Sequence, residues 1–137
     1  MKFFSENSPA FFYLKGLCEV LASDPEFKEM RQNLSDFKKD ELAVKQLEVL
    51  TAMGNVIRAK QKRKEELIPK EVEEFENLRI EFLSNPVAAA YVDSQEQFVN
   101  LRKFIGHFIS KTIEKGDPPQ LQEILNIFEG NQHCGNC

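Results

Sequence analysis

The sequence NPVAAAYVDSQEQFVNLRKFIGHFISKTIE, residues 85–114, decides the fold. Within it, apolar or small residues recur at alternating steps of four and three, the spacing of a helix that packs lengthwise on other helices. These positions are Val87, Tyr91, Ser94, Phe98, Leu101, Ile105, Phe108 and Thr112. Asn85 and Pro86 suit a helix start, because Asn caps free amide groups and Pro has no N–H to leave unpaired. The stretch therefore predicts one long helix, which Gly116 and the two prolines after it end.

Amphipathic stretches on both sides of this helix supply its packing partners. Upstream, caps and apolar spacing predict helices that start near residues 9, 25, 41 and 70. The third and fourth, about 41–66 and 70–83, form an antiparallel hairpin that projects beyond the core and reverses at Ile68-Pro69. We therefore expect an all-α antiparallel bundle of about five long or medium helices. It occupies residues 1–116 and is followed by a C-terminal segment, 117–137.

The C-terminal segment contains a short amphipathic helix at about residues 119–129. Its apolar residues have the spacing i, i+3, i+4, i+7: Leu121, Ile124, Leu125 and Phe128. A helix of about ten residues is marginal alone. It must therefore dock on its own bundle or bind another protein through these four side chains.

Two further sets of residues are expected to be packed. In the first helix these are Phe11, Leu14, Leu17, Cys18 and Leu21, with the cysteine acting as a small hydrophobe. In the long helix, Phe104, Ile109 and Ile113 widen the stripe at its far end. That half of the helix is expected to contact two neighbours.

Composition and charge favour a helical protein of the cytosol. The chain has 137 residues, of which 29% are charged and 42% hydrophobic, enough for one domain. A net charge of −4 argues against nucleic-acid binding by the whole surface. The chain contains neither an apolar run long enough to span a membrane nor the pattern of a signal peptide. Three cysteines, an odd number, without a secretory signal indicate a reducing, cytoplasmic location.

A basic turn precedes the reversal of the hairpin. Its basic residues are Arg58, Lys60, Lys62, Arg63 and Lys64. One interpretation is a basic tip that binds RNA or an acidic partner; the other is a solvated end of the hairpin. No aromatic residue is interleaved for base stacking, and Glu65 and Glu66 follow at once, which favours the solvated end.

The C-terminal residues offer metal ligands. Cys134 and Cys137 form a C-x-x-C motif with His133 before it, so that both sulfurs can reach one ion. Zinc or an iron–sulfur cluster requires about four ligands, and a closed site would therefore take a second chain. A plain tail and, less so, redox exchange are the alternatives.

No other group of residues has the pattern of a catalytic site. His107 is expected to be structural, and the glutamates between Glu71 and Glu76 to form a solvated helix face. Phosphate-binding glycine loops are missing from the sequence. We therefore expect a protein that is not an enzyme.

Several of these segments resemble the YlbF/YmcA family of small helical bacterial regulators, which includes YheA-like proteins. The likeness spans residues 11–113 and includes mainly helix caps and core positions. The segments that carry it are Asp24-Pro25-Glu26-Phe27, Asp40-Glu41-Leu42-Ala43, Ile68-Pro69, and Asn85-Pro86-Val87-Ala88-Ala89-Ala90-Tyr91 followed by Phe98 and Leu101.

The resemblance implies a regulatory and not a catalytic protein, commonly dimeric. YlbF and YmcA act with YaaT in a complex that influences competence, sporulation and biofilm formation and is linked to RNA processing through ribonuclease Y. It further implies a homodimer or a hetero-oligomer with family paralogues, reaching RNA only through partners. The complex carries iron–sulfur clusters held partly by C-terminal cysteines, to which Cys134 and Cys137 would correspond.

Overall fold

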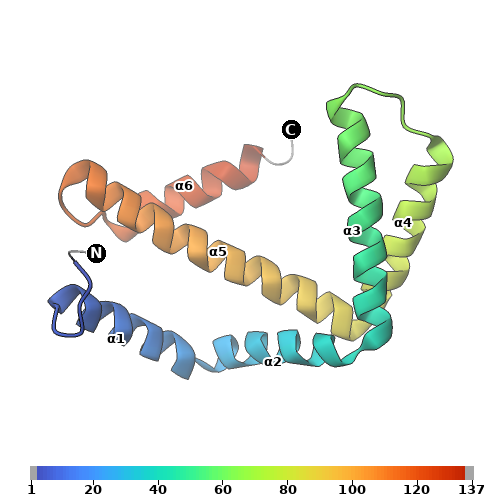
Figure 1. Ribbon diagram of the computed structural model, residues 1–137. Coiled ribbons are helices and arrows are strands. Elements are labelled where there is room, and N and C mark those ends of the chain that lie inside the picture. The colour runs from blue at the N-terminus through green and yellow to red at the C-terminus, as the bar shows by residue number, and fades with distance from the viewer. Residues whose placement is uncertain (1–2, 135–137) are drawn as a thin grey trace. The chain divides into compact units, whose positions relative to one another are not determined.

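The computed structural model describes residues 3–134, and the side chains of residues 3–130. That part of the chain contains six α-helices and no strand (Figure 1), so the all-α prediction is confirmed. Contacts gather the chain into two compact units, one up to Ser94 and one from Gln95. This division by contact does not test the expected one at residue 116, which stays a prediction.

Prolines mark the starts of four helices. These are α1 (Pro9–Ser23), α2 (Pro25–Lys39), α4 (Pro69–Ser84) and α5 (Pro86–Lys115). Proline is suited to the first helical position because its missing N–H would have no helical acceptor there. Side-chain oxygens of Ser8, Asp24 and Asn85 accept backbone N–H bonds in the first turns of α1, α2 and α5. The cap-and-proline pattern therefore predicts these starts correctly.

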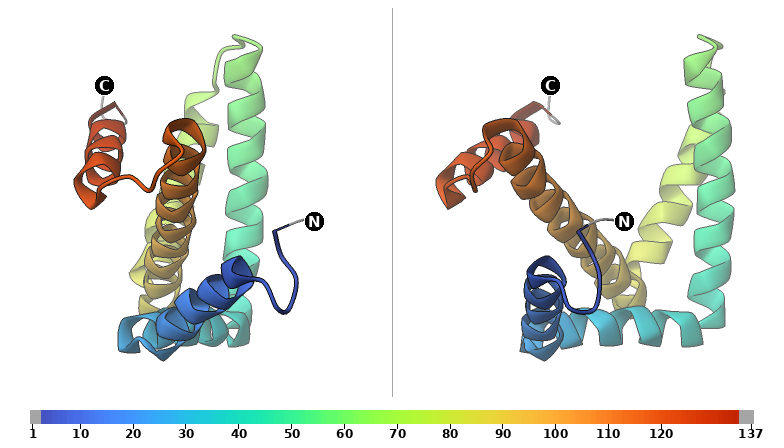
Figure 2. Two further views of the ribbon diagram at one scale, coloured as in Figure 1. Left: turned by 90° about the vertical axis from the view of Figure 1, so that its left-hand side faces the viewer. Right: turned by 60° about the vertical axis from the view of Figure 1, so that its left-hand side comes forward.

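Helices α3 (Glu41–Lys62) and α4 run side by side as an antiparallel hairpin, on which Figures 1 and 2 agree. Helix α3 ends before the predicted Glu66. Lys64 takes a left-handed φ of 57°, and the N–H of Glu65 bonds back to the carbonyl of Lys60 at 3.0 Å. This is the C-terminal motif in which glycine usually holds the left-handed position. Because a lysine holds it here, the sequence carries no stop signal.

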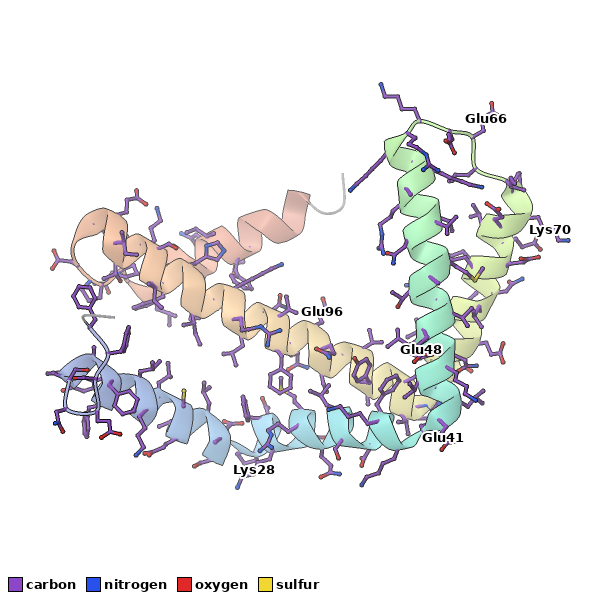
Figure 3. The ribbon with its side chains drawn as sticks, viewed as in Figure 1. Lys28, Glu41, Glu48, Glu66, Lys70 and Glu96 are labelled. Atoms are coloured by element: carbon purple, nitrogen blue, oxygen red, sulfur yellow. The ribbon has the colours of Figure 1, made fainter. Side chains whose placement is uncertain are left out.

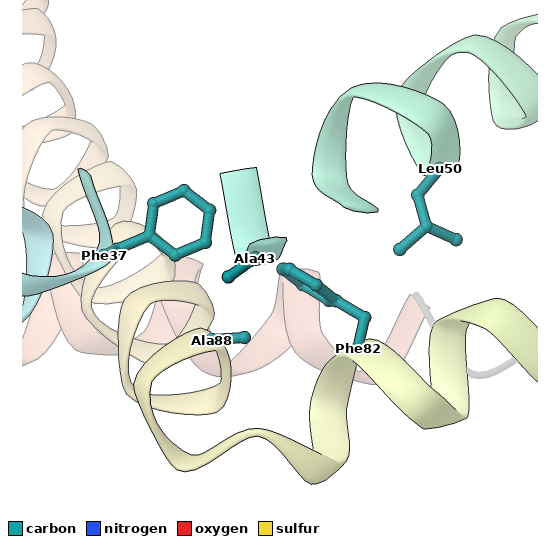
Figure 4. Packing of buried hydrophobic residues seen from close by; sticks show 5 residues of the cluster. All are labelled: Phe37, Ala43, Leu50, Phe82 and Ala88. Carbon is teal, nitrogen blue, oxygen red and sulfur yellow. The ribbon is translucent and has the colours of Figure 1, made fainter. Parts of the chain in front are cut away.

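The core of the first unit is small and built around one aromatic ring. Its buried side chains, drawn in Figure 4, come from four helices: Phe37, Ala43, Leu50, Phe82 and Ala88. The ring of Phe37 stacks on Tyr91 with centroids 3.9 Å apart and meets Phe82 edge-on at 6.2 Å. The two alanines let the N-terminal turns of α3 and α5 approach this cluster closely. Phe37 therefore connects α2 to the hairpin and to α5.

The starts of α3 and α5 are hydrogen-bonded to each other. Asp40 accepts the N–H of Ala43 at 3.0 Å through one carboxylate oxygen and the side-chain amide of Asn85 at 3.0 Å through the other. Asn85 in turn accepts the N–H of Val87 at 3.0 Å. The bond from Asn85, and next the one from Ala43, holds the pKa of Asp40 below its ordinary value. Two helix caps thus form one polar joint.

Every position of the long-helix stripe is buried or half-buried, as predicted. Ser94 is 1% exposed, and its hydroxyl accepts a hydrogen bond from the amide of Asn33 at 3.1 Å. The prediction that Phe104, Ile109 and Ile113 widen the packed stripe is wrong for two of these residues, because Ile109 and Ile113 are 55% and 79% exposed. Ile109 lies roughly 140° around the helix from Phe104, the residue that does contact a neighbour.

The second unit consists of the rest of α5 and helix α6 (Leu121–Cys134). The ring of Phe128 meets Phe104 at 5.9 Å and His107 at 6.1 Å, both edge-on. Helix α6 begins two residues later than expected and continues through Gly130, so it is longer than the predicted 119–129.

Glu123 closes the turn between α5 and α6. Its carboxylate accepts hydrogen bonds from the Lys115 ammonium at 2.9 Å and from the N–H of Gln120 at 2.9 Å. The bond from Lys115 is the larger cause that holds the pKa of Glu123 below its ordinary value. Gly116, with φ of 78°, supplies the left-handed residue that ends α5.

Candidate interaction surface

Helix α1 is the most apolar of the six helices, and none of its residues is buried. Phe11 and Leu21 are half-buried. Leu14 and Leu17 are 45% and 41% exposed, and Cys18 is exposed too, so the expected packing of these three is wrong for the chain by itself. The physical reason is that the main packing partner of α1 in its unit is α2, which continues on from its end (Figure 1). A helix in that position does not lie along α1, so it leaves these side chains uncovered.

The uncovered apolar surface of α1 extends beyond the predicted stripe. Phe12, Tyr13 and Val20 are 70–74% exposed. Tyr13 and Val20 lie beside Leu17, four residues before it and three after it, whereas Phe12 lies on the opposite side of the helix. A helix whose apolar surface is this wide is normally covered by other elements. A large exposed apolar patch on a protein marks an interaction site. Sequence reasoning missed these three residues, although the signal was present as apolar side chains outside the stripe.

The basic tip of the hairpin is partly neutralised by its own neighbours. Lys60 pairs with Glu71 of α4 at 2.8 Å, and Arg63 pairs with Glu65 at 2.8 Å. The guanidinium of Arg58 donates to the side-chain oxygen of Asn55 at 2.7 Å. The two remaining basic residues, Lys62 and Lys64, are exposed. RNA binding by this tip stays a prediction, and three of its five basic side chains already have a polar partner.

The four residues proposed to bind a partner through the C-terminal helix have different environments. Ile124 is 0% exposed, Leu125 and Phe128 are half-buried, and Leu121 is 59% exposed. Because Phe128 contacts α5, the structure favours docking of α6 on its own chain, one of the two alternatives left open by the sequence. His107 is half-buried beside the same ring, as suits a structural histidine.

The proposed metal ligands lie where the structure gives no side-chain positions. Cys134 is the last residue of α6, His133 precedes it, and Cys137 is outside the described residues. Among the residues described, no three His, Cys, Asp or Glu side chains gather as a metal site would require. The zinc or iron–sulfur assignment stays a prediction from the sequence.

These features define an all-α protein whose most apolar helix is uncovered and whose described helices are all too short or too polar to cross a membrane. Residues 13–114 match the family model described as "Control of competence regulator ComK, YlbF/YmcA". The chain belongs to this family, and its role is regulatory. Comparison with curated proteins and with solved structures finds no match.

Proposed function

We propose that this protein regulates without catalysis, by docking helix α1 on a second copy or on a paralogue of its family. The observation that carries the proposal is the exposure of α1, which is apolar on several sides and has no buried residue. Leaving such a helix in water costs roughly 25 cal/mol per Å² of apolar surface. A partner that covers it would recover that free energy, which makes association favourable.

The absence of enzymatic activity is part of this proposal. The two carboxyl groups whose pKa values are lowered, Asp40 and Glu123, both accept backbone N–H bonds at helix starts. Their ionisation therefore serves folding. A catalytic acid would instead need a raised pKa in a water-excluding cleft.

Contact with RNA through partners, and not directly, also belongs to the proposal. The family resemblance links such proteins to ribonuclease Y and to a complex with YaaT. The pairing of Lys60 and Arg63 with glutamates supports an indirect route, because it reduces the positive charge available to phosphates. A cytoplasmic location agrees with the odd number of cysteines.

Light scattering after size exclusion, at several protein concentrations, tests the docking of α1. We expect the wild type to exceed the monomer mass and Val20→Glu to lower the mass. Ile80→Glu is the matched control, since Ile80 is 63% exposed on α4 against 70% for Val20 on α1. A wild-type protein that is strictly monomeric at high concentration, and that gains no mass when mixed with a purified paralogue, contradicts the proposal.

A further inference from the structure

Helix α3 carries a second apolar stripe that its own unit does not cover. Leu42, Val49 and Val56 follow one another at intervals of seven residues, with Ala52 between the last two and Ala59 one turn after Val56. The three large side chains are 65%, 49% and 52% exposed. At 3.6 residues per turn, the stripe lies roughly 140° around the helix from the stripe that contains Ala43 and Leu50. It therefore faces away from α4.

The spacing of this stripe is that of a helix that packs on another helix. A seven-residue repeat keeps apolar side chains on one seam along several turns, whereas the outer face of a hairpin is usually polar. Small residues in a seam allow the two helix axes to approach closely. Beside the stripe lies an apolar hollow of about 300 Å³, lined by Ala52, Met53, Val56, Ile57 and Glu71. The surface is therefore shaped to receive side chains of a second helix.

The polar residues along one edge of the stripe can pair with the same residues of a second copy of α3 that runs in the opposite direction. Glu41, Glu48, Asn55 and Lys62 also follow at intervals of seven, and Figure 3 labels the two glutamates on α3. When two copies of α3 are laid antiparallel with Val49 opposite Ala52, Glu41 faces Lys62 and Glu48 faces Asn55. Each pair occurs twice by symmetry. Within the described residues, neither Glu41 nor Lys62 has an ion-pair partner.

The other residues of the face accept this arrangement. Asn55 already accepts a hydrogen bond from Arg58 through its oxygen, so its amide nitrogen is left as the donor for Glu48. Lys60, on the opposite edge, is neutralised by Glu71. Lys45 lies within the stripe, where its alkyl chain can cover Val56 of the second copy while the ammonium reaches water.

A parallel arrangement lacks these pairs. It would place Glu41 against Gln46 and Glu48 against the thioether of Met53, with no opposite charge at either contact. Helix α1 of another copy is a poorer occupant too, because Lys15 and Glu19 are its two charged residues and cannot match an edge of four. The charge pattern thus selects both the partner and the direction.

We propose that the outer stripe of α3, from Leu42 to Ala59, is a contact with a second copy of this chain, packed antiparallel. This surface is separate from α1 and goes beyond the proposed function. A chain that uses both surfaces assembles further than a dimer, whereas a chain that has lost the α1 contact still pairs through α3.

Charge exchange tests the direction of packing. In full-length protein that carries Val20→Glu, so that the α1 contact is removed, sedimentation velocity is measured for Glu41→Lys, for Lys62→Glu and for both together. Each single change brings like charges together twice and is expected to weaken dimerisation several-fold. The double change restores the opposite pairs and the affinity. Glu73→Lys, the same change of charge on an exposed residue of α4, is the matched control and leaves the affinity unchanged.

Cross-linking tests the register. With Cys18, Cys134 and Cys137 replaced by serine, a mixture of Val49→Cys and Ala52→Cys chains, oxidised with glutathione disulfide, is expected to form a mixed dimer. This mixed dimer should form faster than one from a control mixture in which chains carrying Glu73→Cys take the place of either cysteine variant. Circular dichroism confirms that each variant remains folded.

The possible outcomes separate the two proposals. Failure of the double exchange to restore pairing overturns the antiparallel contact. If α3 variants leave the assembly unchanged while Val20→Glu disrupts it, the α3 proposal is overturned and the proposed function stands. If α3 variants disrupt pairing and Val20→Glu does not, the α3 proposal stands and the α1 docking falls. If the α3 variants leave the mass of the assembly unchanged but abolish binding of a different protein at the stripe, the stripe is a docking site for that protein. This outcome also overturns the second copy as occupant.

Discussion

The joint between Asp40 and Asn85 shows how much two polar side chains contribute at the scale of the residue. Each caps its own helix, and one hydrogen bond of 3.0 Å connects them. Each cap is predictable from the sequence, since Asp and Asn precede Glu41 and Pro86. Their contact is not, because they lie 45 residues apart and no local pattern reports that distance.

Replacing Asn85 by aspartate tests this joint through pH. The variant keeps the cap on Val87 but sets a second carboxylate against Asp40, and like charges at this distance repel. We expect Asn85→Asp to lower the free energy of unfolding relative to the wild type at pH 7. Near pH 4, where one carboxyl group can be protonated, this difference should be smaller. Urea unfolding at the two pH values measures this.

In the wild type, the contribution of Asp40 to the free energy of unfolding depends on pH in the opposite direction to the repulsion in Asn85→Asp. Because the folded pKa of Asp40 lies below its ordinary value, the charged carboxylate stabilises the fold above about pH 3.9, and this contribution is lost as the pH falls through the folded pKa. Acid should therefore lower the free energy of unfolding of the wild type and, at the same time, reduce the difference in this free energy between the wild type and Asn85→Asp. A gap that widens in acid would show that repulsion is not the cause.

At the scale of the element, helix starts are better predicted than helix ends or exposure. A proline that follows a capping residue correctly predicts the starts of α2 and α5. The end of α3 was missed because Lys64 adopts a conformation that its side chain disfavours, which is a property of the turn and not of the residue. The exposure of α1 was missed because apolar spacing predicts that a helix will be covered without saying by which chain.

Gly54 in the interior of α3 gives a prediction at this scale. A Cβ at this position would lie 3.6 Å from a ring carbon of Phe75 in α4, an ordinary van der Waals distance. Glycine in a helix interior costs about 0.8–1.0 kcal/mol relative to alanine. We therefore expect Gly54→Ala to raise the free energy of unfolding by about 1 kcal/mol, as measured by urea unfolding followed by circular dichroism.

Gly106 in α5 is the matched control for this substitution, because an added Cβ there has no neighbour within 4 Å. Gly106→Ala should give the propensity gain alone. If Gly54→Ala destabilises the protein while Gly106→Ala stabilises it, α3 and α4 pack more tightly than the distance to Phe75 implies.

At the scale of the whole molecule, the described chain buries few apolar side chains and exposes many. Apart from Pro119, those that are buried number six, two of them alanines: Phe37, Ala43, Leu50, Phe82, Ala88 and Ile124. Several of the exposed large apolar residues lie on α1 and on the outer stripe of α3, and others lie on α4, α5 and α6. Under the proposed function, a partner that covers these surfaces would also stabilise the fold, so that folding and regulation would depend on the same contacts.

The melting temperature should accordingly depend on protein concentration. For a protein whose folded state is an assembly, a tenfold rise in concentration adds about 1.4 kcal/mol to the apparent stability of the dimer. Because two chains of this size unfold together, that corresponds to an increase of roughly 2–3 °C. Differential scanning calorimetry over a hundredfold range of concentration measures the slope. A variant carrying both Val20→Glu and Val49→Asp should show a lower melting temperature and no slope. A wild-type melting temperature that stays constant over the whole range would show that the isolated chain is stable with α1 and the α3 stripe uncovered, and that neither surface contributes to its folding.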